Sequence, residues 1–322
     1  MSRKILIIRK SSLGDLVHTI PAFNALRAAH ADAEIHWAVT KAGVPLLQRV
    51  KRIDAIREFS GSFLRGLRSE QFDVTIDFQG LLKTAAASWL AGGRRIGFAR
   101  GHTREWGCQI FYTDAVVPRG AHVIEKNLSL AEHAGASPAT GAFSFGELVT
   151  DEERERIDQE LLRLDVAPGF VLINPGAAWA NKRWSPRKFG EVASRLAGRQ
   201  VLVSYGPGER GIAEEVVASS AGAAMLAFPT SFLEFGALAA RSSLLITGDT
   251  GPMHLASAIG ARVLGLFAPT NPYRNGPWND ADRWIVADTR CDFCYRRACP
   301  WENCIDSITI DRVADLAREM LG

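Results

Sequence analysis

One loop of this chain combines the residue types that bind anions. The apolar run Ser243-Leu244-Leu245-Ile246 is typical of a buried strand, and Thr247-Gly248-Asp249-Thr250-Gly251-Pro252-Met253-His254 follows it. Pro252 fits the first position of a helix, where its missing N–H is not needed. The free N–H groups and the positive dipole end of such a helix favour a phosphate, with His254 in the first turn. The alternative is that Asp249 or Thr250 only caps the helix.

A second candidate loop, Lys10-Ser11-Ser12-Leu13-Gly14-Asp15, follows the first predicted strand, residues 4–9. Gly14 permits a sharp turn, and Ser11 and Ser12 offer hydroxyls. Asp15 would be a carboxylate at the end of the strand, where it can take a proton from a sugar hydroxyl as a general base. The alternative is that Asp15 caps a helix.

Two further loops carry cations. In Asp77-Phe78-Gln79-Gly80-Leu81-Leu82-Lys83, the lysine falls in the first turn of a helix, where the dipole disfavours it unless it meets an anion. A solvated surface lysine is the simpler alternative. In the run from Asn174 to Pro186, Lys182 and Arg183 stand between two tryptophans and suit a leaving diphosphate. Trp184 fits either a ligand contact or the core.

The run Gly206-Pro207-Gly208-Glu209-Arg210-Gly211 matches the dinucleotide fingerprint G-x-G-x-x-G. It lies between a predicted strand and a predicted helix, as the fingerprint requires. However, residues 225–229, which follow at about the expected spacing, contain no acidic residue for a ribose. We interpret the run as a nucleotide loop in the second half of the chain; an NAD(P)-dependent oxidoreductase is the alternative.

The elements that must position these loops alternate between strand and helix, which predicts parallel sheets wrapped by helices. A boundary rich in Gly, Ala, Ser, Pro and Thr spans about residues 134–149 and separates domains 1–150 and 151–322. Two such halves imply a ligand cleft between them. The predicted strands are residues 4–9, 34–39, 54–59, 73–78, 170–174, 200–205, 243–247 and 262–267. The predicted helices are residues 21–30, 82–90, 151–164, 186–197, 210–218, 232–240, 252–259 and 310–321.

Composition is that of an ordinary globular protein: 322 residues, 47% apolar, 23% charged and a net charge of +3, too small to predict nucleic-acid binding. Arginine greatly outnumbers lysine, 30 to 8 of the 38 basic residues. No run approaches the ~20 apolar residues that span a bilayer, and the N-terminus does not fit a signal peptide. We expect a cytoplasmic protein.

The motifs occur in one order: Ser-Ser-x-Gly-Asp, Asp-x-Gln-Gly, Pro-Gly…Lys-Arg-Trp and Asp-Thr-Gly-x-x-His. In this order they resemble glycosyltransferase family 9, the ADP-heptose:lipopolysaccharide heptosyltransferases, from residue 5 to about residue 272. The resemblance implies a GT-B type fold of two Rossmann-like domains facing each other across a cleft. The acceptor would bind residues 1–150, and the nucleotide-sugar would bind residues 151–322.

The resemblance also implies an inverting displacement without a cofactor or metal, in which Asp15 is the base. Lys182 and Asp249-Thr250-Gly251 would hold the diphosphate, Glu234 would approach the ribose, and His254 would lie beside the donor. We place Gly206 in the donor site as well. The donor would be ADP-heptose and the acceptor the Kdo–lipid A inner core. Gln79-Gly80-Leu81-Leu82-Lys83 looks like the enzyme that adds the first heptose, whereas Pro175-Gly176 with Lys182-Arg183-Trp184 looks like the one that adds the second. Another nucleotide-sugar, or a sugar-binding relative without catalysis, are the alternatives within the fold.

The anionic acceptor predicts a basic surface in the first half. We assign Ser11, Ser12 and Lys83 to it, together with Arg94, Arg95 and Arg104 from a cluster that includes Arg100 and His102. Phe63-Leu64-Arg65 and Leu67-Arg68 would rest on the inner membrane surface of a monomeric, peripheral enzyme. A solvated basic face is the alternative.

Four cysteines crowd the segment Cys291-x2-Cys294-x4-Cys299-x4-Cys304. Four thiols can hold zinc, but this spacing is not the paired C-x2-C pattern of a zinc ribbon. We expect a structural loop without metal; zinc or disulfides are the alternatives.

Overall fold

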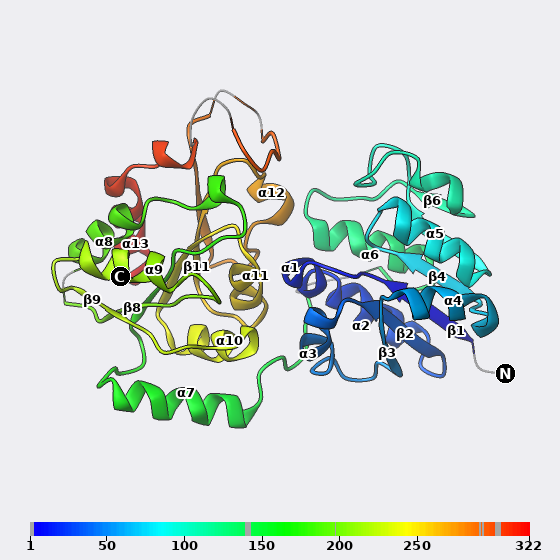
Figure 1. Cartoon of the computed structure of the whole chain (residues 1–322), viewed down its shortest axis with the longest axis horizontal. Coiled ribbons are helices and arrows are strands. Elements are labelled where there is room, and N and C mark those ends of the chain that lie inside the picture. Colours follow the sequence, from blue (N-terminus) through cyan, green and yellow to red (C-terminus); the bar gives the residue numbers. More distant parts are fainter. Residues whose placement is uncertain (1–2, 139–142, 197, 290, 292, 300–303) are drawn as a thin grey trace. The chain divides into compact units, whose positions relative to one another are not determined.

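The computed structural model describes residues 3–138, 143–196, 198–289, 291, 293–299 and 304–322 (Figure 1). The chain divides into two compact units, Met1–Leu148 and Val149–Gly322. Each unit is built on one six-stranded sheet, and every strand pair in both sheets is parallel. The predicted α/β fold class is confirmed.

The first unit has strand order β3-β2-β1-β4-β5-β6, which places β1 and β4 at the centre. Its elements are β1 (Lys4–Ile8), α1 (Leu13–Val17), α2 (Ile20–Ala29), β2 (Glu34–Val39), η1 (Lys41–Gly43), α3 (Val44–Leu47), β3 (Ala55–Glu58), α4 (Gly61–Glu70), β4 (Val74–Asp77), α5 (Leu82–Ala91), β5 (Arg94–Phe98), η2 (Cys108–Phe111), β6 (Asp114–Val116) and α6 (Val123–His133).

The second unit has strand order β12-β11-β10-β7-β8-β9, which places β10 and β7 at the centre. Its elements are α7 (Asp151–Arg163), β7 (Val171–Asn174), η3 (Ala180–Lys182), α8 (Pro186–Arg195), β8 (Val201–Val203), α9 (Arg210–Ala218), β9 (Ala224–Leu226), α10 (Phe232–Arg241), β10 (Leu244–Gly248), α11 (Gly251–Ala258), β11 (Val263–Phe267), α12 (Pro272–Asn275), β12 (Arg283–Val286), η4 (Cys304–Ser307) and α13 (Ile310–Leu321).

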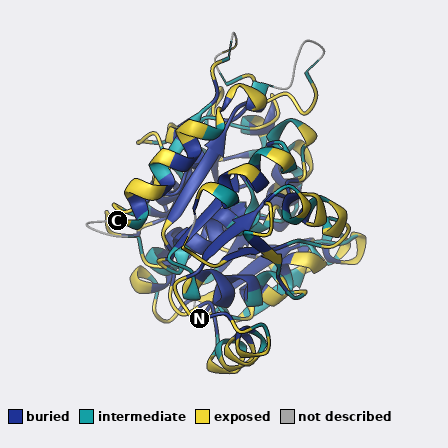
Figure 2. Cartoon of the chain, turned by 90° about the vertical axis from the view of Figure 1, so that its left-hand side faces the viewer, coloured by how far each residue is buried: buried dark blue, intermediate teal, exposed yellow. Residues whose placement is uncertain are grey.

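The central strands read as continuous apolar runs because helices cover both faces of each parallel sheet. In β10, Leu244 and Ile246 pack into the cluster that contains α8, α9 and α13, while Leu245 packs into the cluster that contains α7, α10 and α11. Figure 2 shows the strands buried and the helices exposed along their outer sides. The polar loops are therefore confined to the two edges of each sheet, and the loops of interest follow the carboxyl ends of strands.

Most predicted elements are present with ends shifted by one or two residues, and Arg210–Ala218 and Ile310–Leu321 match in full. Helix α11 begins at Gly251, so Pro252 is its second residue and not its first. Helices α4 and α6 and strands β5, β6, β9 and β12 were not predicted from the sequence. Within the described ranges, no helix is both long and apolar enough to cross a lipid bilayer.

Candidate functional site

Asp15 lies in the five-residue helix α1, immediately after the loop that leaves β1. Its Oδ2 accepts hydrogen bonds from the Ser12 backbone N–H at 3.0 Å and from the Ser12 hydroxyl at 3.1 Å. The capping alternative is therefore present in the structure. It does not exclude a chemical role, because the other carboxylate oxygen has different partners.

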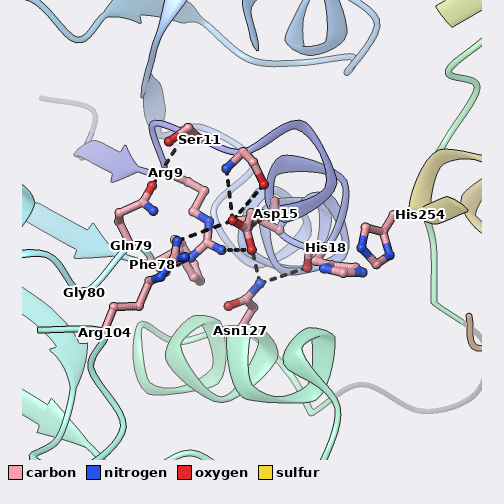
Figure 3. A network of polar contacts seen from close by, with 12 residues as sticks. Arg9, Ser11, Asp15, His18, Phe78, Gln79, Gly80, Arg104, Asn127 and His254 are labelled. Carbon is pink, nitrogen blue, oxygen red and sulfur yellow. Dashed lines mark hydrogen bonds and ion pairs between the residues drawn. The ribbon is translucent and has the colours of Figure 1, made fainter. Parts of the chain in front are cut away.

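Arg9 is the principal partner of Asp15, with Nη2 2.5 Å from Oδ1 (Figure 3). The Arg9 side chain is only 5% exposed, and it also donates to the carbonyl oxygen of Phe78. Arg104 approaches from the other side, with Nη1 3.7 Å from Oδ2. Burial on its own raises the pKa of Asp15, but Arg9, Arg104 and the Ser12 hydrogen bonds outweigh it and lower that pKa to about 2. Asp15 is therefore ionised at neutral pH.

Gln79 fixes the loop that precedes Asp15. Its Oε1 accepts from the backbone N–H of Lys10 at 3.0 Å and of Ser11 at 3.2 Å. The fully buried Asp77 in turn accepts from the Gln79 N–H at 2.8 Å and from the Tyr112 hydroxyl at 2.8 Å. The Asp-x-Gln-Gly motif thus holds the backbone of the Asp15 loop in place.

Gly80 allows the backbone of Arg104 to approach the end of the sheet where the Asp15 loop lies. It has a φ of 66°, and a Cβ there would lie 3.2 Å from the Arg104 nitrogen and 3.3 Å from Thr103 Cα. Glycine is the residue that tolerates both this backbone conformation and this close approach.

Lys10 and Lys83 add positive charge beside Arg104. Burial lowers the pKa of Lys10, and the neighbouring Lys83 and Arg104 lower it further. The Lys10 ammonium also lies 3.4 Å from the Ser11 hydroxyl. Of the predicted acceptor residues, the structure thus gathers Ser11, Ser12, Lys83 and Arg104 near Asp15.

Arg94 and Arg95 lie at the amino end of β5, on the opposite edge of the sheet from the Asp15 loop. Arg94 pairs with Asp114, with Nη2 2.9 Å from Oδ1, and Arg95 Nε donates to the Phe111 carbonyl oxygen at 2.8 Å. The structure does not bring these two arginines together with the other predicted acceptor residues.

In the second unit, three side chains contact the buried carboxylate of Asp249, and a tryptophan packs against one of them. Lys182 Nζ lies 2.5 Å from Oδ2, and the Thr270 hydroxyl donates to the same oxygen at 2.7 Å. His254 Nε2 lies 3.3 Å from Oδ1. Lys182 also lies 4.5 Å from the centre of the Trp179 ring. Burial raises the pKa of Asp249, but His254 and Lys182 outweigh it and hold that pKa well below its usual range.

Thr250 is the N-cap of α11, and its hydroxyl accepts from the Met253 N–H at 3.4 Å. This confirms the capping alternative for Thr250 and leaves Asp249 to organise Lys182 and His254. Gly248 permits the arrangement, because a Cβ there would lie 2.8 Å from the Lys182 carbonyl oxygen. Thr270 was not predicted as a site residue from the sequence. The feature that could have identified it is its position after β11, the strand that pairs with β10.

The other predicted donor residues have local partners. Glu234 accepts from the Ser231 N–H at 2.7 Å and pairs with Arg156. The Gly206 N–H donates to Glu209 Oε2 at 3.2 Å. A Cβ on Gly211 would meet nothing within 4 Å, whereas the third glycine of a dinucleotide fingerprint serves close helix–strand packing. This geometry weakens the NAD(P) alternative.

Trp184 is 1% exposed and its indole N–H donates to the Ile308 carbonyl oxygen, so the core alternative is confirmed for it. Arg183 holds its own loop by donating to the Ala177 carbonyl oxygen at 2.6 Å.

In the cysteine-rich segment, Cys291 and Cys294 are exposed, and Cys299 and Cys304 are half-buried. Among the residues that the structure describes, no three His, Cys, Asp or Glu side chains come together as a metal site. The metal-free loop and the zinc alternative both remain predictions.

Two relatives of known function are similar to the chain over most of its length. Lipopolysaccharide heptosyltransferase 1 of Pseudomonas aeruginosa is 28% identical to the chain, over 93% of the chain and 88% of the relative. Lipopolysaccharide heptosyltransferase 3 of Escherichia coli K12 is 26% identical, over 83% of each chain.

Solved structures share the fold. Escherichia coli heptosyltransferase WaaC with ADP has a TM-score of 0.76 at 20% identity, over 98% of this chain and 97% of that one. A family 9 glycosyltransferase from Veillonella parvula has a TM-score of 0.83 at 19% identity, over 99% and 97% of the two chains.

The family model of glycosyltransferase family 9 (heptosyltransferase) matches residues 60–305. The resemblance drawn from the motifs is confirmed, and the oxidoreductase alternative is not favoured. The chain belongs to glycosyltransferase family 9 and is a glycosyl-transferring enzyme.

Proposed function

We propose that this enzyme transfers heptose from ADP-heptose to the inner core of lipopolysaccharide, onto Kdo or heptose attached to lipid A. The two relatives described above are named lipopolysaccharide heptosyltransferases. WaaC, a structural neighbour, has been solved with ADP and with ADP-2-deoxy-2-fluoro heptose. The motif order of the chain supports the same donor class.

Asp15 is the general base of this proposal. The ionised carboxylate takes the proton of the acceptor hydroxyl while that oxygen attacks the anomeric carbon. The bond between this carbon and the diphosphate breaks on the opposite side, so ADP leaves and the configuration inverts. Arg9 keeps the carboxylate ionised and oriented before the reaction, since its guanidinium is buried beside it.

Lys182, Thr250, Gly251 and His254 meet the diphosphate of the donor, where developing negative charge needs cations and N–H groups. Asp249 repels phosphate, so its role is to hold Lys182 and His254 through the contacts described above. Glu234 and Gly206 contact the nucleoside of the donor. When the donor binds, Glu234 gives up its ion pair with Arg156, and Gly206 gives up its hydrogen bond to Glu209.

The acceptor binds the first unit through Ser11, Ser12, Lys83 and Arg104. Arg94 and Arg95 are omitted from this proposal because they are engaged at the other edge of the sheet. The reaction needs no cofactor and no nucleic acid. We also propose that the enzyme acts as a monomer in the cytoplasm, in peripheral contact with the inner membrane that carries the acceptor.

The observation that carries the proposal is the ionised Asp15 beside a cluster of cations in a family 9 chain. The test is transfer to Kdo–lipid A and to its mono-heptosylated form, with ADP-heptose compared against other ADP- and UDP-sugars. We expect ADP release and a heptosylated product with ADP-heptose alone. Turnover with a different nucleotide-sugar and none with ADP-heptose would assign another transferase of the same fold.

A further inference from the structure

Among the large apolar side chains that are exposed on the first unit, four come from neighbouring segments. The exposed fractions are 45% for Leu82, 52% for Trp89, 76% for Trp106 and 75% for Ile110. Single exposed apolar residues are normal, but a cluster of them marks an interaction site.

These four side chains come from two adjoining segments. Leu82 and Trp89 are seven residues apart on α5 and therefore lie on the same face of the helix. Helix α5 packs against η2, which contains Ile110. The Leu82 N–H donates to Glu105 Oε2 at 2.6 Å, beside Trp106, and a Cβ on Gly107 would lie 3.7 Å from Leu82 Cδ2. We call these four residues the apolar patch.

Arginines border the apolar patch. The Arg68 guanidinium lies 5.8 Å from the centre of the Trp89 ring, and that of Arg100 lies 5.9 Å from the centre of the Trp106 ring. Arg68 comes from α4, which lies beside α5 (Figure 1). The segments 61–70, 82–91 and 99–110 together contain five Arg and Lys residues against two acids, Glu70 and Glu105. Glu70 is already paired with Arg57, and Arg104 with Asp15, which leaves four cations against Glu105.

Of the three apolar residues predicted from the sequence to rest on the membrane, two are buried and Leu64 is partly buried. Phe63 is 6% exposed and Leu67 is fully buried, so both belong to the core of the first unit. Arg65 and Arg68 of the same helix are exposed. Helix α4 therefore supplies positive charge, and the apolar side chains come from α5, from η2 and from the loop before η2.

We propose that the apolar patch, with Arg68 and Arg100 beside its tryptophans, docks onto an anionic phospholipid bilayer. Tryptophan prefers the interface between headgroups and acyl chains, and arginine next to it pairs with anionic headgroups. A protein partner of matching shape would not require this surplus of positive charge. The positive charge and the tryptophans together therefore favour a lipid surface.

The apolar patch lies next to the residues that we propose bind the acceptor. Lys83 adjoins Leu82 on α5, and Arg104 lies two residues before Trp106, so the proposed acceptor residues border the patch. An acceptor held in the bilayer by its acyl chains would present its sugar beside Asp15. This step rests on the proposed function, whereas the binding of vesicles does not.

Vesicle sedimentation tests the surface without using catalysis. Vesicles of phosphatidylglycerol and phosphatidylethanolamine should bind the wild-type protein, with blue-shifted tryptophan fluorescence, and pure phosphatidylcholine should bind it about 10-fold less. Trp106→Ser combined with Ile110→Ser should lower binding about 10-fold at any salt. Arg68→Ser combined with Arg100→Ser should lower it at low salt only. The matched control is Leu162→Ser, an 80% exposed leucine on α7 of the second unit.

Transfer assays then separate docking from chemistry. The Trp106/Ile110 variant should lose activity on an acceptor embedded in vesicles and keep it on the deacylated acceptor. Unchanged vesicle binding by this variant overturns the proposal. So does a wild-type dimer that the variant abolishes while vesicle binding stays the same, because the patch would then cover a second copy. Vesicle binding without any heptose transfer would contradict the proposed function and leave the docking surface intact.

Discussion

Arg9 Nη2 lies 2.5 Å from Asp15 Oδ1; Arg9 directly follows β1, and Asp15 lies a few residues further on, in α1. The proposed base is therefore paired with a buried cation before any substrate arrives. The pairing keeps Asp15 ionised and fixes its orientation, at the expense of its affinity for a proton. Proton transfer must then accompany formation of the new C–O bond, when the attacking hydroxyl has become strongly acidic.

Replacing Asp15 by Asn should lower turnover about 100-fold or more while ADP affinity stays within about 2-fold, because the amide cannot take up the proton. Asn retains the size of the side chain and can still accept the Ser12 hydrogen bonds. Turnover on saturating ADP-heptose and calorimetry with ADP are the two measurements. Asp32→Asn, an exposed aspartate of the same unit, is the control. Near-normal turnover in Asp15→Asn would remove Asp15 from the role of base.

Replacing Arg9 by Gln should shift the acid limb of the pH profile of kcat/KM, where activity falls at low pH, to a higher pH. The folded-state pKa of Asp15, about 2, lies below its ordinary value of 3.8. The ion pair therefore stabilises the fold above about pH 4 and loses this contribution as the pH falls through about 2. Without Arg9, only Arg104 and the Ser12 hydrogen bonds oppose the effect of burial, so the pKa of Asp15 rises and we expect the acid limb at a higher pH.

Arg104→Gln is the matched comparison for Arg9→Gln. Arg104 is 3.7 Å from Asp15 and its side chain is half-exposed, so its removal should shift the limb less. Thermal melts at pH 7 check that both variants fold. An Arg9→Gln profile that overlays the wild-type profile down to pH 4 would mean that Arg9 does not control the ionisation of Asp15.

Lys182→Ala should weaken ADP binding by about 10- to 100-fold, since one charge-assisted bond to the diphosphate is lost. Asp249 also loses a partner at 2.5 Å, so the variant's melting temperature must be measured beside its affinity. Arg187→Ala, a 79% exposed cation of α8, is the control. An unchanged calorimetric affinity for ADP in Lys182→Ala would place the diphosphate elsewhere.

Cys294→Ser should leave activity and metal content unchanged, because we expect a structural loop without metal. Metal analysis of protein purified without chelators is the measurement. One equivalent of zinc in the wild type that disappears in the variant would instead support the ligand alternative, in which thiolates hold the ion. Cys108→Ser serves as a control because Cys108 is buried in the first unit, outside the cluster.

The elements that the sequence predicted best are those with one dominant pattern. The strand Lys4–Ile8 is apolar throughout after its first residue, and the helix Ile310–Leu321 has a clear amphipathic pattern. Strand β5 begins with two arginines and reads as a basic surface, yet both arginines are engaged by neighbouring elements. Helix α4 contains Gly61 and Gly66, which weaken the helical signal.

The site residues could be predicted where they lie within one continuous loop, as Asp15 does and as Asp249 and His254 do. It was not predictable where the partner comes from another strand or reads as ordinary surface charge. Arg9 looks like the polar end of a strand, but the fold buries its side chain. Thr270 is 21 residues from Asp249 in sequence, and only the pairing of β10 with β11 brings it into hydrogen-bond distance.

Gly248→Ala should weaken ADP binding without any change of charge, because the new methyl group would stand 2.8 Å from the Lys182 carbonyl oxygen and must displace that loop. A displacement of about 1 Å is enough to impair a positioned group, and we expect a loss of about 10-fold or more. Gly211→Ala is the control: its Cβ meets nothing within 4 Å, and alanine suits the helix that contains it. Calorimetry with ADP compares the two variants, and thermal melts report their folding. Equal ADP affinities in the two variants would show that the Gly248–Lys182 approach does not shape the donor site, whereas a loss confined to Gly211→Ala would return the nucleotide to the Gly206–Gly211 loop.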